Sequence, residues 1–190
     1  FSAGLATQGM IPFCNIYSTF AQRGYDQIIH DVALQKLGVV FCFDRAGLVG
    51  EDGATHHGSF DLSYMRLVPN VIISAPMNEE ELRNLMFTSL KYRNIPFSIR
   101  YPRGYGVMTD WRGEMKEMEV GRSKLIKDGE DILVLSIGTV GNMVKSAIED
   151  INKEGLYPSH YNVIFLKPID EFLLREVLPK YRVVITVEDG

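Results

Sequence analysis

The segment 44–58, with the sequence DRAGLVGEDGATHHG, places acidic, basic and imidazole side chains among four glycines. It follows an apolar run at 39–43 that is typical of a buried strand. Glycines disfavour a helix here and permit positive φ angles and a close approach of the backbone. In an open α/β sheet, ligands bind in the loops that leave the carboxyl ends of strands. We therefore interpret 44–58 as a candidate functional site.

Two arginines extend this candidate site. Arg45 and Arg103 each come just after an expected strand and beside a glycine, in the sequences DRAG and YPRG. A solvated surface arginine is the usual alternative, but two guanidinium groups at strand ends fit a clamp for a phosphate or carboxylate better. His56 and His57 share the glycine-rich loop, where an imidazole either bonds the backbone or exchanges a proton with a substrate oxygen.

A second loop is expected after the first strand, at 17–23, with Phe20 at its centre. Phe20 fits the core as well as it fits a ring that stacks on a planar heterocycle. Arg23 has a similar alternative, because it can bond a carbonyl or a surface acid instead of a ligand. His30 falls near the apolar face of an expected helix and is interpreted as a partly buried structural residue.

The composition limits the classes of function. The 190 residues are 46% hydrophobic and 23% charged, with a net charge of −4, which is typical of a globular protein and gives no reason to expect nucleic acid or an anionic membrane. We find no apolar run long enough to cross a bilayer and no secretory signal, so a cytoplasmic location is expected. Cys14 and Cys42 lie in apolar strand-like runs and are expected to be reduced core residues. Dinucleotide-binding, P-loop and hydrolase-elbow motifs are absent, as is any zinc-type cysteine spacing.

Strands and helices alternate along the chain, which predicts an α/β fold with parallel sheets and helices on both faces. Strands are expected at 11–17, 39–43, 71–75, 97–101, 132–137, 162–166 and 182–187. Helices are expected at 25–37, 62–67, 78–92, 139–153 and 170–178. The periodicity fails over 102–124, which indicates a segment connecting two α/β units. Asn78 is expected to cap its helix, with Glu81 placed to bond back to the cap.

Four motifs in order carry a resemblance to a known family: IYSTFAQRGYDQ at 16–27, HDVA at 30–33, the segment 44–58, and YPRG at 101–104. With LKPID at 166–170, they resemble the 1-deoxy-D-xylulose-5-phosphate synthases, which are thiamin-diphosphate enzymes of the transketolase superfamily. The resemblance covers essentially the whole chain. It implies a pyrimidine-binding domain at 1–105, a linker at 106–124 and a transketolase C-terminal-like domain at 125–190. Both ends look cut, so we expect a fragment of such an enzyme.

The resemblance also implies an activity. Enzymes of this family condense pyruvate with D-glyceraldehyde 3-phosphate and release carbon dioxide, which begins non-mevalonate isoprenoid synthesis and feeds thiamin and pyridoxal synthesis. The implied cofactors are thiamin diphosphate and Mg²⁺, and the implied full-length protein is a homodimer. The diphosphate and metal site, like the activating glutamate, belongs to sequence that precedes Phe1. Because the cofactor carries the hard chemistry, the fragment alone is expected to be inactive.

Matching positions assign ligand-binding roles through the resemblance. Phe20 matches the ring that packs on the aminopyrimidine of the cofactor, and Arg23 matches an active-site arginine near it. Arg45 and Arg103 match the arginines that hold the substrate phosphate. No metal ligand is assigned within this chain.

The catalytic roles implied in the same way fall on Tyr17, Asp52 and His56, which match polar residues facing the substrate or its adduct. His56 is chosen over His57 by its position in the motif. The alternatives are another superfamily enzyme, such as a transketolase or a 2-oxo-acid dehydrogenase β subunit, and a non-catalytic dimerisation module.

Overall fold

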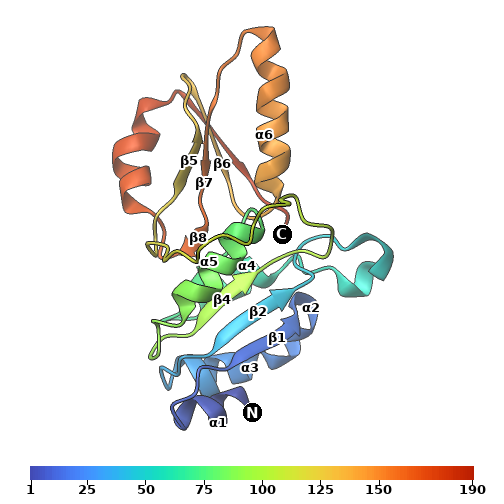
Figure 1. Ribbon diagram of the computed structural model, residues 1–190, viewed down its shortest axis with the longest axis vertical. Coiled ribbons are helices and arrows are strands. Elements are labelled where there is room, and N and C mark those ends of the chain that lie inside the picture. The colour runs from blue at the N-terminus through green and yellow to red at the C-terminus, as the bar shows by residue number, and fades with distance from the viewer.

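The computed structural model describes residues 1–190, which form two α/β units arranged along the long axis of the molecule (Figure 1). The first unit contains a five-stranded sheet with the order β1-β2-β4-β3-β8, and the second a four-stranded sheet with the order β5-β7-β6-β9. The strands are β1 (Phe13–Tyr17), β2 (Val40–Asp44), β3 (Ile72–Ser74), β4 (Phe97–Arg100), β5 (Lys124–Lys127), β6 (Ile132–Ser136), β7 (Ser159–Asn162), β8 (Phe165–Lys167) and β9 (Val183–Val187).

The chain also contains six α-helices and several 3₁₀ and π-helical segments. The α-helices are α1 (Ser2–Thr7), α2 (Ser18–Ala21), α3 (Tyr25–Gln27), α4 (Asp61–Leu67), α5 (Glu79–Ser89) and α6 (Val140–Ile151). The 3₁₀ segments are η1 (Gln22–Gly24), η3 (Gly50–Asp52), η4 (Ala54–His56), η5 (Asn152–Glu154) and η7 (Leu178–Lys180), and the π-helical ones are η2 (Ile28–Ala33) and η6 (Leu173–Val177). None of these helices has the length and apolar character needed to cross a membrane.

The predicted α/β class is confirmed, and the sheets are mainly parallel. Strands β1, β2, β4 and β3 are parallel, as are β7, β6 and β9. Each sheet also has one antiparallel edge strand, β8 on β3 and β5 on β7. The alternation of strands and helices does not reveal these two edge strands, because neither is joined to its neighbour by a helical crossover.

Three local expectations were wrong. The single strand expected at 162–166 is two strands, β7 and β8, which belong to different sheets. The chain changes sheets at 163–164, where Ile164 has a positive φ of 59°. The loop expected at 17–23 is helical, because α2 begins directly after β1 and continues into η1. Strand β5 was not expected.

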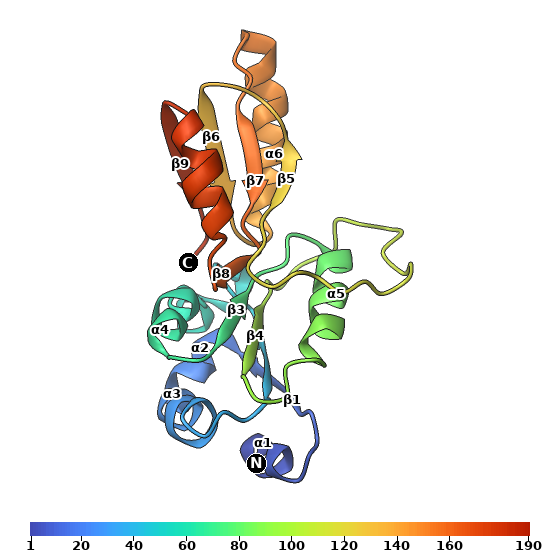
Figure 2. The same cartoon turned by 90° about the vertical axis from the view of Figure 1, so that its left-hand side faces the viewer.

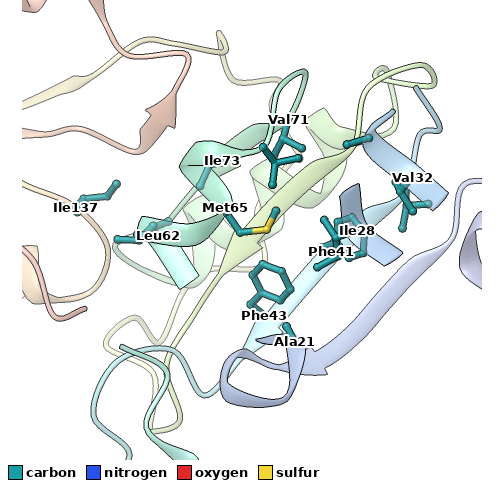
Figure 3. Packing of buried hydrophobic residues seen from close by; sticks show 14 residues of the cluster. Ala21, Ile28, Val32, Phe41, Phe43, Leu62, Met65, Val71, Ile73 and Ile137 are labelled. Atoms are coloured by element: carbon teal, nitrogen blue, oxygen red, sulfur yellow. The ribbon is translucent and has the colours of Figure 1, made fainter. Parts of the chain in front are cut away.

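Helices cover both faces of each sheet (Figures 1 and 2). In the first unit, α5 lies on one face, while α2, α3 and α4 lie on the other. Phe41 and Phe43 of β2 point into the core on the face that carries α2, α3 and α4; Figure 3 shows Phe41 beside Ile28 and the side chain of Met65 of α4 pointing toward the sheet. Val40 and Cys42 of the same strand point to the opposite face, toward α5. This alternation is the pattern expected of a strand buried on both faces.

The helix cap at Asn78 is confirmed, but the reciprocal bond is not formed. The side-chain oxygen of Asn78 accepts a hydrogen bond of 2.9 Å from the backbone N–H of Glu81. The carboxylate of Glu81 instead accepts hydrogen bonds from the backbone N–H of Met77 (2.8 Å) and from the side-chain amide of Asn162 (2.9 Å). Asn162 belongs to β7, so Glu81 helps to join the two units.

Candidate functional site

The candidate site lies where three parallel neighbours, β1, β2 and β4, end. Tyr17 is the last residue of β1, Arg45 directly follows β2, and Arg103 follows β4 by three residues. Because β1, β2 and β4 are adjacent and parallel, their carboxyl ends meet at one edge of the sheet. The structure therefore brings together Tyr17, Arg45 and Arg103, which come from the ends of three different strands.

A glycine-rich loop spans residues 47–58 above this edge. Gly47 and Gly58 close its base with two backbone hydrogen bonds of 2.9 and 2.8 Å. Gly47 has a positive φ of 74°, which suits glycine. A Cβ atom on Gly58 would lie 2.5 Å from the backbone oxygen of Arg45 and 2.6 Å from Cβ of Ser18. The glycines therefore allow the loop to lie directly against the ends of β1 and β2.

Three rings gather beneath this loop. Tyr17 and Phe20 stack with their centroids 5.1 Å apart and an interplanar angle of 12°. The imidazole of His56 meets both rings edge-on, at 6.4 Å from Tyr17 and 5.5 Å from Phe20. Phe20 is 37% exposed and is absent from the hydrophobic cores, so its ring is accessible to solvent. The core alternative for Phe20 does not fit this geometry.

Ion pairs hold the arginines beside these rings. Cζ of Arg45 lies 4.0 Å from the centroid of the Tyr17 ring, a cation–π contact. Nε of Arg45 donates to Asp52 Oδ2 at 3.0 Å, and its Nη1 donates to Asp44 Oδ2 at 2.7 Å. Desolvation would lower the pKa of Arg45, but its hydrogen bond to Asp52 and the charge of Asp44 outweigh this and raise that pKa. Nε of Arg103 lies 3.6 Å from the same Asp52 oxygen.

The two loop histidines have different surroundings. Nδ1 of His57 accepts a hydrogen bond of 3.2 Å from the backbone N–H of Val49, inside the loop. Nδ1 of His56 lies 3.0 Å from the hydroxyl of Thr55, and its ring faces Phe20. His57 therefore holds the loop, while His56 lies beside the exposed ring of Phe20.

Arg23 and His30 lie at the margin of the site or outside it. Cζ of Arg23 lies 5.8 Å from the centroid of the Phe20 ring, so Arg23 reaches the three rings only through this cation–π contact. His30 is exposed and its Nδ1 lies 2.9 Å from a carboxylate oxygen of Asp26. The expectation that His30 is partly buried was wrong, because it lies on the solvent side of η2.

Sequence reasoning missed a buried ion-pair network behind the arginines. Arg100, the last residue of β4, is 3% exposed and donates from Nε to Asp61 (3.0 Å) and from Nη1 to Asp189 (2.6 Å). Desolvation would lower the pKa of Arg100, but the charges of Asp61 and Asp189 raise it, so the group stays cationic. The available signal was an arginine inside an apolar strand, since a buried charge needs partners.

A cavity of about 810 Å³ lies between the two units, next to the arginines. Its lining includes Leu48, Asn78, Tyr101 and Arg103 of the first unit and Asn142 of α6. No group of three or more His, Cys, Asp or Glu side chains is arranged to hold a metal ion. The arrangement supplies guanidinium groups for an anion and exposed aromatic surface for a planar ring.

Comparison with known families matches both units. The transketolase pyrimidine-binding domain matches residues 1–106, and the transketolase C-terminal domain matches residues 121–190. The chain is 60% identical over its full length to a 1-deoxy-D-xylulose-5-phosphate synthase of Parabacteroides distasonis and 56% identical to that of Cytophaga hutchinsonii. It spans 30% of the length of each of these relatives. The resemblance expected from the motifs is confirmed.

Solved structures show the same fold. A split-gene transketolase, described as an inactive β4 tetramer, superposes with a TM-score of 0.86 at 28% identity, over 98% of this chain and 60% of its own. A transketolase mutant from Pichia stipitis has a TM-score of 0.75 at 16% identity, over 93% of this chain and 26% of its own. The second likeness concerns the fold alone.

Proposed function

Because this chain belongs to the transketolase family, we propose that it is part of a 1-deoxy-D-xylulose-5-phosphate synthase. The full-length protein would condense pyruvate with D-glyceraldehyde 3-phosphate and release carbon dioxide. The observation that carries this proposal is the meeting of Arg45 and Arg103 around Asp52, next to the exposed ring of Phe20. A phosphate clamp beside an aromatic platform fits a phosphorylated acceptor next to a heterocyclic cofactor.

The residues of this chain fit one part of thiamin diphosphate. The exposed ring of Phe20 would pack on the aminopyrimidine, and Arg23 beside it would face the same ligand. That cofactor, when bound, supplies a nucleophilic carbon and an electron sink for decarboxylation. Mg²⁺ and the diphosphate are proposed to be held by other parts of the full-length protein, as the resemblance implies.

The substrate would lie between the arginines and the rings. Arg45 and Arg103 would bind the phosphate of D-glyceraldehyde 3-phosphate, with paired donors that suit its oxygens. Asp52 would hold the two guanidinium groups in place until the phosphate arrives. His56 would donate a proton to, or accept one from, a substrate oxygen above Phe20, and Tyr17 would support Arg45 from below.

The proposal extends to the organisation of the full-length enzyme. We propose domains at 1–105 and 125–190 joined by a linker at 106–124, within a homodimeric cytoplasmic protein. The present chain alone is proposed to be inactive, because it spans 30% of the length of its relatives and the resemblance assigns the diphosphate and metal site to other parts of the full-length protein.

The test uses the full-length protein, with this chain alone as a control. Carbon dioxide release from pyruvate is measured with thiamin diphosphate and Mg²⁺, with and without D-glyceraldehyde 3-phosphate. Acceptor-stimulated release with a deoxyxylulose phosphate product, lost in Arg103→Ala, supports the synthase and its clamp. Transfer from ketose donors without use of pyruvate would identify a transketolase instead. No turnover from a folded, cofactor-loaded protein would favour a non-catalytic module.

A further inference from the structure

We propose that Asp189 is a positioning residue for the phosphate clamp and acts through Arg100. This proposal rests on the proposed function, because it concerns how tightly the same site binds a phosphate. Asp189 lies two residues beyond β9, in the second unit, whereas Arg100 ends β4 in the first. Oδ1 of Asp189 accepts a hydrogen bond of 2.6 Å from Nη1 of Arg100, so the second unit reaches behind the candidate site.

Asp189 also contacts the base of the glycine-rich loop. A Cβ atom on Gly47 would lie 2.5 Å from Oδ2 of Asp189, so the carboxylate occupies the space that a side chain would fill. Gly47 follows Arg45 by two residues and pairs with Gly58 to close the loop. Nη2 of Arg100 lies 3.5 Å from the backbone oxygen of Gly58. Asp189 and Arg100 therefore contact both sides of the loop base that follows the first clamp arginine.

The same pair is linked to the second clamp arginine. Arg103 follows Arg100 by three residues, in the segment that leaves β4. Arg103 and Asp189 both line the cavity of about 810 Å³ between the units. A change in the position of Arg100 would therefore be transmitted to both clamp arginines. A geometric error in the groups that hold a substrate reduces its binding and reaction even when no direct contact is lost.

The ion-pair network allows Asp189 to be removed without unfolding the protein. Arg100 retains Asp61, which is 1% exposed and 3.0 Å away, so the buried cation keeps a partner. The Asp189 side chain is 28% exposed, so its removal opens no sealed cavity. Removal of a partner is severe only when it leaves a buried charge uncompensated. Asp189→Ala and Asp189→Asn are therefore both suitable variants.

The experiment compares two acceptors in the full-length holoenzyme. KM and kcat are measured with D-glyceraldehyde 3-phosphate and with D-glyceraldehyde, which lacks the phosphate. In Asp189→Ala, KM for the phosphorylated acceptor is expected to rise about tenfold. The values for D-glyceraldehyde and for pyruvate are expected to stay near those of the unaltered enzyme. Asp189→Asn retains an oxygen that can accept a hydrogen bond from Arg100. Its KM for D-glyceraldehyde 3-phosphate is expected to lie between those of the unaltered enzyme and Asp189→Ala.

Asn162→Ala is the matched control. It removes a different bond between the units, from Asn162 of β7 to Glu81 of α5, and neither residue forms an ion pair with Arg45, Arg100 or Arg103. A loss specific to the phosphorylated acceptor in Asp189→Ala and absent from Asn162→Ala supports the proposal. An equal loss with both acceptors, no loss at all, or the same specific loss in Asn162→Ala would overturn it. Failure of the proposed function is distinct, because the unaltered enzyme would then use neither acceptor.

Discussion

Oδ2 of Asp52 accepts a hydrogen bond of 3.0 Å from Nε of Arg45, which joins the glycine-rich loop to the end of β2. The same oxygen lies 3.6 Å from Nε of Arg103. One carboxylate therefore lies against two guanidinium groups that come from different strands. In this arrangement the arginines are oriented before any ligand arrives, which reduces the ordering that binding requires.

Replacement of Asp52 tests this orientation. In Asp52→Ala, both guanidinium groups lose a shared partner, and we expect kcat/KM for D-glyceraldehyde 3-phosphate to fall about tenfold to a hundredfold. Glu51→Ala is the control, because the neighbouring Glu51 side chain is 90% exposed and reaches only Arg103, at 3.8 Å. Equal losses in the two variants would mean that the loop acts through its charge rather than through the Asp52 contacts.

Replacement of Gly58 tests whether the glycine-rich loop must lie against the ends of β1 and β2. The methyl group in Gly58→Ala would overlap the backbone oxygen of Arg45, so we expect a cost of about 1–3 kcal/mol in the free energy of unfolding and a displaced loop. Activity of the full-length enzyme should fall with it. Gly113→Ala has open space around the new methyl group and should leave both quantities unchanged. A neutral Gly58→Ala would contradict the close approach.

The burial of His160 leads us to expect that the stability of the protein depends on pH. His160 is fully buried in β7, its Nε2 lies 2.7 Å from the hydroxyl of Ser136, and its Nδ1 has no partner. Burial lowers the pKa of His160 from its ordinary value of 6.5. Below that value the unfolded chain binds a proton that the folded chain does not, so stability is present above about pH 6.5 and is lost as the pH falls.

The check is the midpoint of thermal unfolding, measured between about pH 7 and about pH 5.5. We expect the midpoint to decrease as the pH falls. In His160→Gln, the dependence of the midpoint on pH should become shallower. An unchanged slope in His160→Gln would show that other groups cause the acid sensitivity.

Cys42 should resist thiol reagents in the folded protein. It is completely buried in β2, and burial, with a contribution from Cys14, raises the pKa of its thiol to about 12. The reactive thiolate is therefore scarce at neutral pH as well as inaccessible. Alkylation followed by mass spectrometry should modify Cys42 only after denaturation, with the half-buried Cys14 as the internal reference. Modification of both at one rate in the native protein would contradict this burial.

The sequence predicted the parts of the site that depend on local patterns. Apolar runs indicated β2 and β4, glycines indicated the loop, and parallel strands then required Arg45 and Arg103 to meet. The partners of Arg100 were not predictable in this way, because Asp189 is 89 residues distant along the chain. Local periodicity carries no information on such a pair. Helix α2 was missed since four residues are too few to show a helical period.

Strand β8 lies between β7 and β9, within the part of the chain that forms the second unit, but it completes the sheet of the first. Its residues pair with β3, and Nζ of Lys167 donates to the backbone oxygen of Val68 at 2.5 Å. A gene chimera that joined the first unit of one relative to the second unit of another at 106–124 would therefore give β3 a foreign edge strand. The two units are expected to be inherited together, and successful recombination would need a crossover that keeps β3 and β8 from the same parent.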